Sequence, residues 1–130
     1  MLRVAPGRAK PSRASNFELW SWLFMRVSAV VLLLMALAHF AIMHVFNTPD
    51  QVNYDFVAAR FATPFWRVYD LVLLGLGVLH GMNGVRIVID DYIHSRGWRV
   101  LVMSLLWVVT FVFLVIGTQV VLSFQPEVIR

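Results

Sequence analysis

The residues of this sequence that could do chemistry are ionisable side chains inside long apolar runs. Such residues are costly within a membrane, so they are functional candidates by default. The chain has no cysteine, which excludes disulfides, iron–sulfur ligation and covalent haem attachment through cysteine. Any electron carrier held here would depend on histidine. The candidates are Arg26, His39, His44, Asp70, His80, Arg86, Asp90 and Asp91.

His80 has the most informative surroundings. Gly77 precedes it by three residues and Gly84 follows it by four, so all three share one helix face. A histidine bordered by residues without side chains offers a nitrogen ligand beside a flat, open surface, which a porphyrin ring needs. The same glycines also suit close helix packing, with His80 hydrogen-bonded to a neighbouring helix. The spacing leaves both interpretations open.

His39 lies in an earlier apolar run, at a different depth from His80. It is about 28 Å along a helix axis from Trp20, whereas His80 is about 17 Å from Asp91 at the other end of its own run. The two histidines therefore differ in depth by about 10 Å, so they cannot ligate opposite faces of one iron. Either they serve two haems or His39 is structural.

Asp91 and Tyr92 follow His80 at the end of its run. Asp91 comes eleven residues after His80, which places it about 20° from the same helix face. A carboxylate and a phenol at a membrane edge suit proton delivery to a reducible ring, because the phenol donates while the acid resupplies protons. The alternative is a polar helix end with an aromatic anchor.

Arg26 and Ser28 lie at a depth comparable with that of Arg86. Arg26 either extends along apolar surface to reach the interface or contacts a haem propionate or a quinone oxygen. Arg86 precedes the Asp-Tyr pair at interfacial depth, and we expect it in the neighbourhood of a haem propionate or of the quinone.

The elements that must position these residues are membrane-spanning helices. The chain has 130 residues, of which 60% are hydrophobic and 14% charged, with a mean hydropathy of +0.76. A span needs about 20 apolar residues, and the apolar runs 20–46, 65–93 and 98–124 each exceed that length. What remains is too short for a nucleotide-binding or flavin domain. The sequence predicts an all-α membrane protein with three transmembrane helices over residues 16–130, preceded by a basic disordered arm at 1–15.

Local signals define the connections and the orientation. Thr48-Pro49 and Thr63-Pro64 are typical helix starts, and residues 50–61 between them predict a short helix on the membrane surface. Lysine and arginine concentrate in the arm and in the turn near residue 96, which predicts a cytoplasmic amino terminus and an outside carboxyl terminus. The net charge of +4 thus indicates topology and attraction to anionic lipid, with no nucleic-acid partner.

The stretch from His80 to Tyr92, HGMNGVRIVIDDY, resembles the small cytochrome b membrane-anchor subunit of succinate dehydrogenase (complex II). The resemblance implies that His80 is an axial ligand of haem b, and that Asp91 and Tyr92 contact quinone. Arg26-Val27-Ser28 is similar to the Arg-x-Ser-Gly signature of the sister anchor subunit, whose arginine and serine line the quinone site, although the flanking residues differ. His39 matches the first-helix histidine of the two-haem class, which implies a possible second haem.

The resemblance also implies partners: a flavoprotein subunit that oxidises succinate, an iron–sulfur subunit, and a sister cytochrome b anchor subunit. This chain would be a non-catalytic subunit of the complex, multi-pass in a bacterial cytoplasmic membrane. Likeness to the actinobacterial form implies menaquinone. Two other classes remain open, a small transporter with a proton relay through its histidines and aspartates, and a haem-free structural anchor.

Overall fold

The computed structural model describes residues 16–124, and this part of the chain is helical with no strand. The predicted arm at 1–15 lies outside the described residues. The long helices are α1 (Asn16–Phe40), α3 (Pro64–Tyr92) and α4 (Arg96–Ser123), and α1 continues as one π-helical turn, η1 (Ala41–Val45). All three are long and apolar enough to cross a membrane. The predicted all-α fold with three spans is confirmed.

The connection between α1 and α3 holds two short helices, η2 (Pro49–Gln51) and α2 (Tyr54–Phe61), where the sequence predicted a single one. The single-helix prediction was wrong because Asn53 caps α2: its side chain accepts a hydrogen bond from the Phe56 N–H at 3.1 Å. The predicted starts were right, since Thr48 precedes Pro49 in η2 and Thr63 precedes Pro64 in α3. The position of this connection on the membrane surface stays a prediction.

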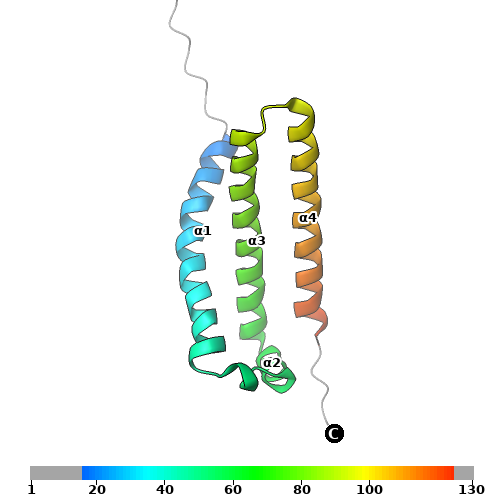
Figure 1. The fold of residues 1–130 in the computed structure, drawn as a ribbon. Coiled ribbons are helices and arrows are strands. Elements are labelled where there is room, and N and C mark those ends of the chain that lie inside the picture. The colour runs from blue at the N-terminus through cyan, green and yellow to red at the C-terminus, as the bar shows by residue number, and fades with distance from the viewer. Residues whose placement is uncertain (1–15, 125–130) are drawn as a thin grey trace, which may run out of the picture.

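α3 is the central helix and packs against both α1 and α4 (Figure 1). The start of α1, the end of α3 and the start of α4 lie at one end of the bundle, called here the inner end. The end of η1, α2 and the end of α4 lie at the outer end. That the inner end faces the cytoplasm stays a prediction from the distribution of lysine and arginine.

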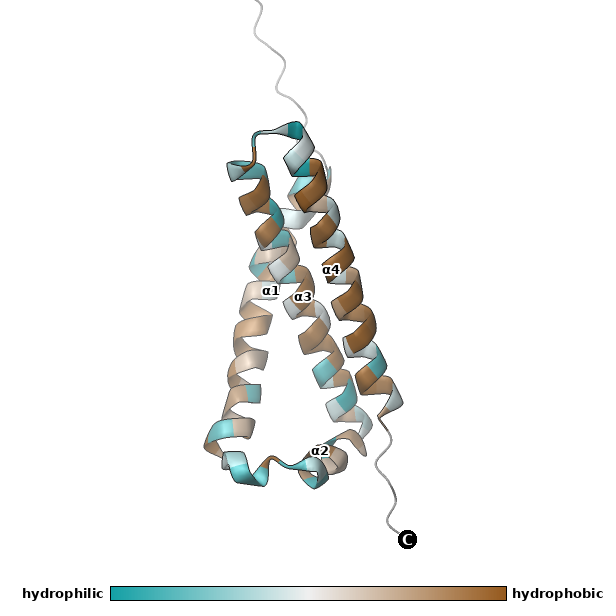
Figure 2. Cartoon of the chain, turned by 45° about the vertical axis from the view of Figure 1, so that its right-hand side comes forward, coloured by the Kyte–Doolittle hydropathy of each residue, from teal (hydrophilic) through white to brown (hydrophobic). Residues whose placement is uncertain are grey.

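The interior of this bundle is more polar than its surface. Among the described residues the buried apolar side chains are Met82, Ile89 and Val121, and the buried polar ones are Ser28, Arg60, Asn83 and Thr110. Large apolar side chains are exposed along every long helix, and α4 is apolar over most of its length (Figure 2). This inversion suits a bilayer, where apolar side chains meet lipid and polar ones must find partners between helices.

Candidate functional site

His80 lies on the side of α3 that faces α1, where its ring meets Ser28. The Ser28 Oγ is 2.7 Å from His80 Nδ1, and the same hydroxyl donates to the Phe24 carbonyl at 2.6 Å. Ser28 is only 3% exposed, so this contact is sealed inside the helix interface. The structure thus brings together two of the predicted site residues, His80 and Ser28, in direct contact.

The glycines around His80 leave its helix face lightly covered. A Cβ atom at Gly77 would lie 4.0 Å from Leu32, and one at Gly84 would lie 3.9 Å from Met25, so both glycines face α1 at ordinary contact distance. A Cβ atom at Gly81 would meet nothing within 4 Å. The residue next to His80 therefore leaves open space on its side of α3, while Gly77 and Gly84 lie at the edge next to α1.

One helical turn closer to the inner end, three polar side chains form a hydrogen-bonded cluster. Arg86 Nε donates to Asn83 Oδ1 at 3.0 Å, and Ser21 Oγ donates to the same oxygen at 3.0 Å. Arg86 also donates to Ser21 Oγ at 3.3 Å and lies 3.5 Å from the Asp90 carboxylate. The Asn83 Nδ2 atom is buried without a hydrogen-bond partner among the described residues, so the cluster keeps one amide group whose two N–H donors are free.

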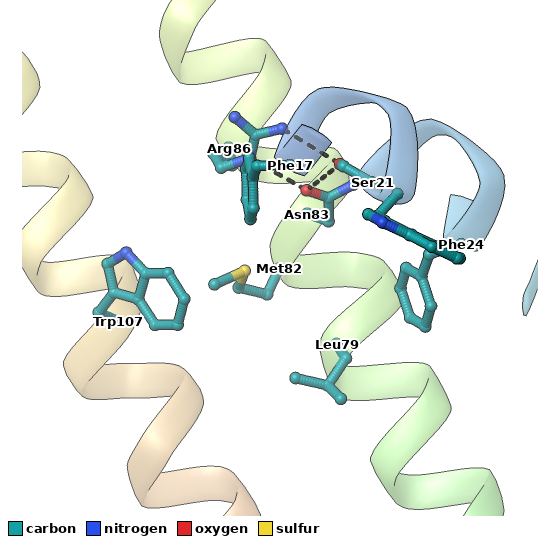
Figure 3. Close-up of a pocket in the computed structure, with 9 residues that line it drawn as sticks. Phe17, Ser21, Phe24, Leu79, Met82, Asn83, Arg86 and Trp107 are labelled. Carbon is teal, nitrogen blue, oxygen red and sulfur yellow. Dashed lines mark hydrogen bonds between the residues drawn. The ribbon is translucent and has the colours of Figure 1, made fainter. Parts of the chain in front are cut away.

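This polar cluster forms one wall of a cavity of about 300 Å³ between α1, α3 and α4 (Figure 3). Phe17 lies beside Arg86, with its ring 5.3 Å from the guanidinium carbon, while Met82 and Trp107 face each other across the cavity. The cavity combines a cationic, hydrogen-bonding wall with apolar and aromatic sides, which suits an amphipathic molecule with a polar head. The other lining residues are Trp20, Phe24 and Leu79.

Asp91 and Tyr92 occupy the last turn of α3 at the inner end and are not among the residues that line this cavity. Both are exposed, Tyr92 to 79%, and no hydrogen bond or ion pair of either side chain is found within residues 16–124. Arg26 is also exposed, and its guanidinium lies 3.9 Å from the Trp22 ring centre. These three residues are therefore available to a partner, whereas Ser28 is not.

At the outer end, His39, Asp70 and Arg60 form a second polar cluster. The Asp70 carboxylate lies 3.3 Å from Arg60 Nη2 and 3.7 Å from His39 Nδ1. The Arg60 side chain is 8% exposed and its guanidinium lies 4.2 Å from the Trp66 ring centre. This cluster joins three elements, because His39 belongs to α1, Arg60 to α2 and Asp70 to α3.

Residues 8–122 match the model of one protein family, described as the succinate dehydrogenase/fumarate reductase transmembrane subunit. The chain belongs to this family. It is 28% identical to a succinate dehydrogenase hydrophobic membrane anchor subunit of Rickettsia typhi, over 85% of this chain and 88% of that one. It is 33% identical to the subunit of the same name from Archaeoglobus fulgidus, over 62% and 68%. It is 26% identical to the succinate dehydrogenase 2 membrane subunit SdhC of Mycobacterium tuberculosis, over 87% and 82%.

As a succinate dehydrogenase anchor subunit, the chain is a multi-pass bacterial membrane protein and a non-catalytic part of its complex. Its association with the other subunits of that complex explains why so much apolar and aromatic surface is exposed when the chain is taken alone.

The sequence did not identify Ser21, Asn83 or Arg60 as site residues of this anchor subunit. Asn83 carried a usable signal, because it is a polar residue in an apolar run, three residues from both His80 and Arg86. Ser21 sits between two interfacial tryptophans and gave no such signal. Arg60 lies in the connection between two apolar runs and gave no signal, since nothing local shows that α2 folds it back against Asp70.

Proposed function

We propose that this anchor subunit binds haem b through His80, together with a sister anchor subunit, and that its inner end contributes to a quinone site. The Ser28–His80 contact carries the proposal. It fixes the ring by Nδ1, which leaves Nε2 uncommitted for an axial bond, and metal-ligating histidines in general are held by a hydrogen bond at the other nitrogen. Once bound, a haem supplies a one-electron carrier between the extrinsic subunits and the membrane.

A sister anchor subunit is needed because these three helices cannot enclose a porphyrin. α1, α3 and α4 lie in a row with α3 in the middle, and most of their apolar side chains are exposed (Figure 1). A second set of helices would cover this surface and supply a further ligand for the haem. The remaining partners in the proposal are a flavoprotein subunit that oxidises succinate and an iron–sulfur subunit, both on the cytoplasmic side.

We place the quinone at the inner end, next to Tyr92 and Asp91. The exposed phenol of Tyr92 can donate a hydrogen bond to a quinone carbonyl, and the neighbouring Asp91 carboxylate can return protons from water at the membrane edge. Arg86 lies within the same end of α3 and would favour negative charge as it develops on a quinone oxygen. Menaquinone is the proposed quinone.

A second haem on His39 is the alternative to a single haem on His80. His39 Nδ1 lies 3.7 Å from Asp70, too far for a hydrogen bond, so its ring is not held as the His80 ring is. For this reason one haem, on His80, is the simpler proposal. The b-type absorbance of His39→Ala separates one haem from two.

A reduced-minus-oxidised absorption spectrum of the purified complex tests the proposal. We expect a b-type alpha band in the wild type and its loss in His80→Ala, because a methyl group cannot replace the imidazole ligand. His44→Ala is the matched control, since His44 is an exposed histidine near the end of the first span, and its spectrum should equal that of the wild type. A wild-type complex without a b-type band would instead identify a haem-free structural anchor.

A proton relay along the chain's histidines and aspartates is less well supported. It would need close contacts in series, but within residues 16–124 the one close histidine–aspartate approach is between His39 and Asp70. About 15 Å of helix separates Asp70 from His80, and about 17 Å separates His80 from Asp91.

A further inference from the structure

The Ser28 hydroxyl has two polar neighbours at hydrogen-bond distance, and their chemistry fixes where its one proton goes. The Phe24 carbonyl oxygen lies at 2.6 Å and the His80 Nδ1 atom at 2.7 Å. A carbonyl oxygen can only accept, so the bond to Phe24 must use the serine proton. If Ser28 gave that proton to His80 instead, two acceptor oxygens would face each other at 2.6 Å inside an apolar interface, which is unfavourable.

The bond between Ser28 and His80 must therefore run from the imidazole to the serine. Nδ1 carries the hydrogen and donates it to a lone pair of the Ser28 oxygen, and Nε2 of the neutral ring keeps its own lone pair. The only other nitrogen of His80 is thus in the protonation state that a metal ligand requires. Because Ser28 is 3% exposed and its oxygen is anchored to α1 through Phe24, water cannot easily replace this bond.

We propose that Ser28 is a positioning residue for His80, which fixes the tautomer and the rotation of the imidazole and increases its electron donation toward haem iron. The proposal rests on the proposed function, in which His80 is an axial ligand. It differs from the quinone role that the resemblance implied for Ser28, because a hydroxyl with both neighbours satisfied and 3% exposure has no free donor for a quinone. The ring is oriented by a different helix, α1, so haem chemistry depends on how α1 packs against α3.

The test compares Ser28→Ala with the wild type in the intact complex, by redox titration of the haem and by electron paramagnetic resonance of the ferric state. Without the serine oxygen, the Nδ1–H group loses its hydrogen-bond acceptor, so the imidazole donates less electron density to iron. The ferrous state is then stabilised relative to the ferric state. We expect a more positive midpoint potential, a changed low-spin ferric signal from a freer ring, and haem affinity lower by about 10- to 100-fold. Ser28→Thr keeps the hydroxyl and should restore the wild-type potential.

Thr110→Val is the matched control. Thr110 is also buried, at 5% exposure, and its hydroxyl donates a hydrogen bond to the carbonyl of Leu106, four residues earlier, at 2.7 Å. Unlike Ser28, it has no hydrogen bond with a histidine among the described residues. Loss of this hydroxyl should leave the potential and the ferric signal unchanged. An equal shift in Thr110→Val would overturn the proposal, because the effect would then be a general consequence of losing a buried hydroxyl.

The remaining outcomes separate this proposal from the function on which it rests. If His80→Ala removes the haem but Ser28→Ala changes neither potential nor signal, Ser28 is not a positioning residue and the haem assignment stands. If the wild type holds no haem on His80, the proposed function itself fails. Should Ser28→Ala not assemble, Ser28→Cys, whose sulfur donates and accepts only weakly, must move the potential in the same direction, and an unmoved potential refutes the proposal.

Discussion

His80 and His39 are both histidines inside apolar helices, but different partners face their Nδ1 atoms. His80 lies 2.7 Å from a neutral hydroxyl on the neighbouring helix. His39 lies 3.7 Å from a carboxylate, and its buried Nδ1 has no hydrogen-bond partner within residues 16–124. The first ring is held in one orientation by a hydrogen bond, whereas the second can turn without breaking one. A histidine inside an apolar helix is therefore not oriented for metal binding by its residue type alone. It also needs a hydrogen-bond partner at one ring nitrogen.

The charges at the two ends differ in the same way. At the outer end, Asp70 and Arg60 pair with each other at 3.3 Å and are mostly shielded, with side-chain exposures of 17% and 8%. At the inner end, Arg86 and Asp90 are 3.5 Å apart and more exposed, at 21% and 41%. A closed, buried pair holds helices together, while open polar groups at a membrane edge await a partner or ligand. We therefore expect the outer end to contribute mainly to stability and the inner end to the proposed function.

The largest expected effect is on stability, from Asp70→Ala. This change leaves the Arg60 charge buried without its carboxylate, and breaking a buried pair in this way costs about 3–5 kcal/mol. We expect a clear drop in the thermal unfolding midpoint of the complex and in its level in the membrane. Asp50→Ala is the control, since Asp50 is an exposed carboxylate in the same connection, in η2. Equal stability of the two variants would contradict a structural role for the outer end.

His39→Ala tests whether the two histidines are independent. Because His80 has its own partner on α1, we expect its haem to persist in this variant, and the b-type absorbance to fall to no less than about half if two equal haems are present. Half the absorbance per complex would assign a second haem to His39, and unchanged absorbance would leave His39 as a neighbour of Asp70 alone. Complete loss would show that the two ends act as one site.

Tyr92→Phe and Asp91→Asn test the open polar groups of the inner end. A phenol bonded to a quinone carbonyl contributes about 0.5–1.5 kcal/mol, and more as charge develops during reduction, so we expect quinone reduction to fall severalfold or more. Succinate oxidation with a water-soluble acceptor should survive, since that assay draws electrons before the membrane. If both variants reduce quinone at the wild-type rate and keep their haem, the Asp-Tyr pair is only a polar helix end and the quinone binds elsewhere.

The sequence predicted the three long helices well because their causes are local or set by the bilayer. The run 65–93 became Pro64–Tyr92 and the run 98–124 became Arg96–Ser123, since apolar length defines both helices and a Thr-Pro start also defines the first of them. The first apolar run, 20–46, corresponds to α1 (Asn16–Phe40) and the following turn η1 (Ala41–Val45), so the helix begins four residues before the run. The connection was less predictable, because Asn53 restarts the chain as a separate helix.

The contacts that define the candidate site could not be predicted in this way. Ser28 and His80 are 52 residues apart, and their meeting depends on how α1 is rotated against α3. Apolar side chains surround each long helix, so no amphipathic pattern shows which face of α1 meets α3. The pairing of Arg60 with Asp70 was hidden for another reason, because nothing local in the sequence shows that α2 folds back against α3. His80 itself was identifiable because its glycine neighbours lie on its own helix.

The smallest expected effect is from Arg26→Gln, which tests whether Arg26 belongs to the proposed quinone site at the inner end. The guanidinium of Arg26 rests 3.9 Å from the ring centre of Trp22, and both side chains are exposed. An exposed cation–π contact contributes about 0.5–1 kcal/mol, so loss of the charge should lower stability by no more than that. We expect quinone reduction within about twofold of the wild type, because the Arg26 guanidinium contacts Trp22 and not the proposed quinone residues Asp91 and Tyr92. If quinone reduction instead falls as far as in Tyr92→Phe, with haem content intact, Arg26 leaves Trp22 to reach the quinone in the assembled complex, and the quinone site extends onto α1.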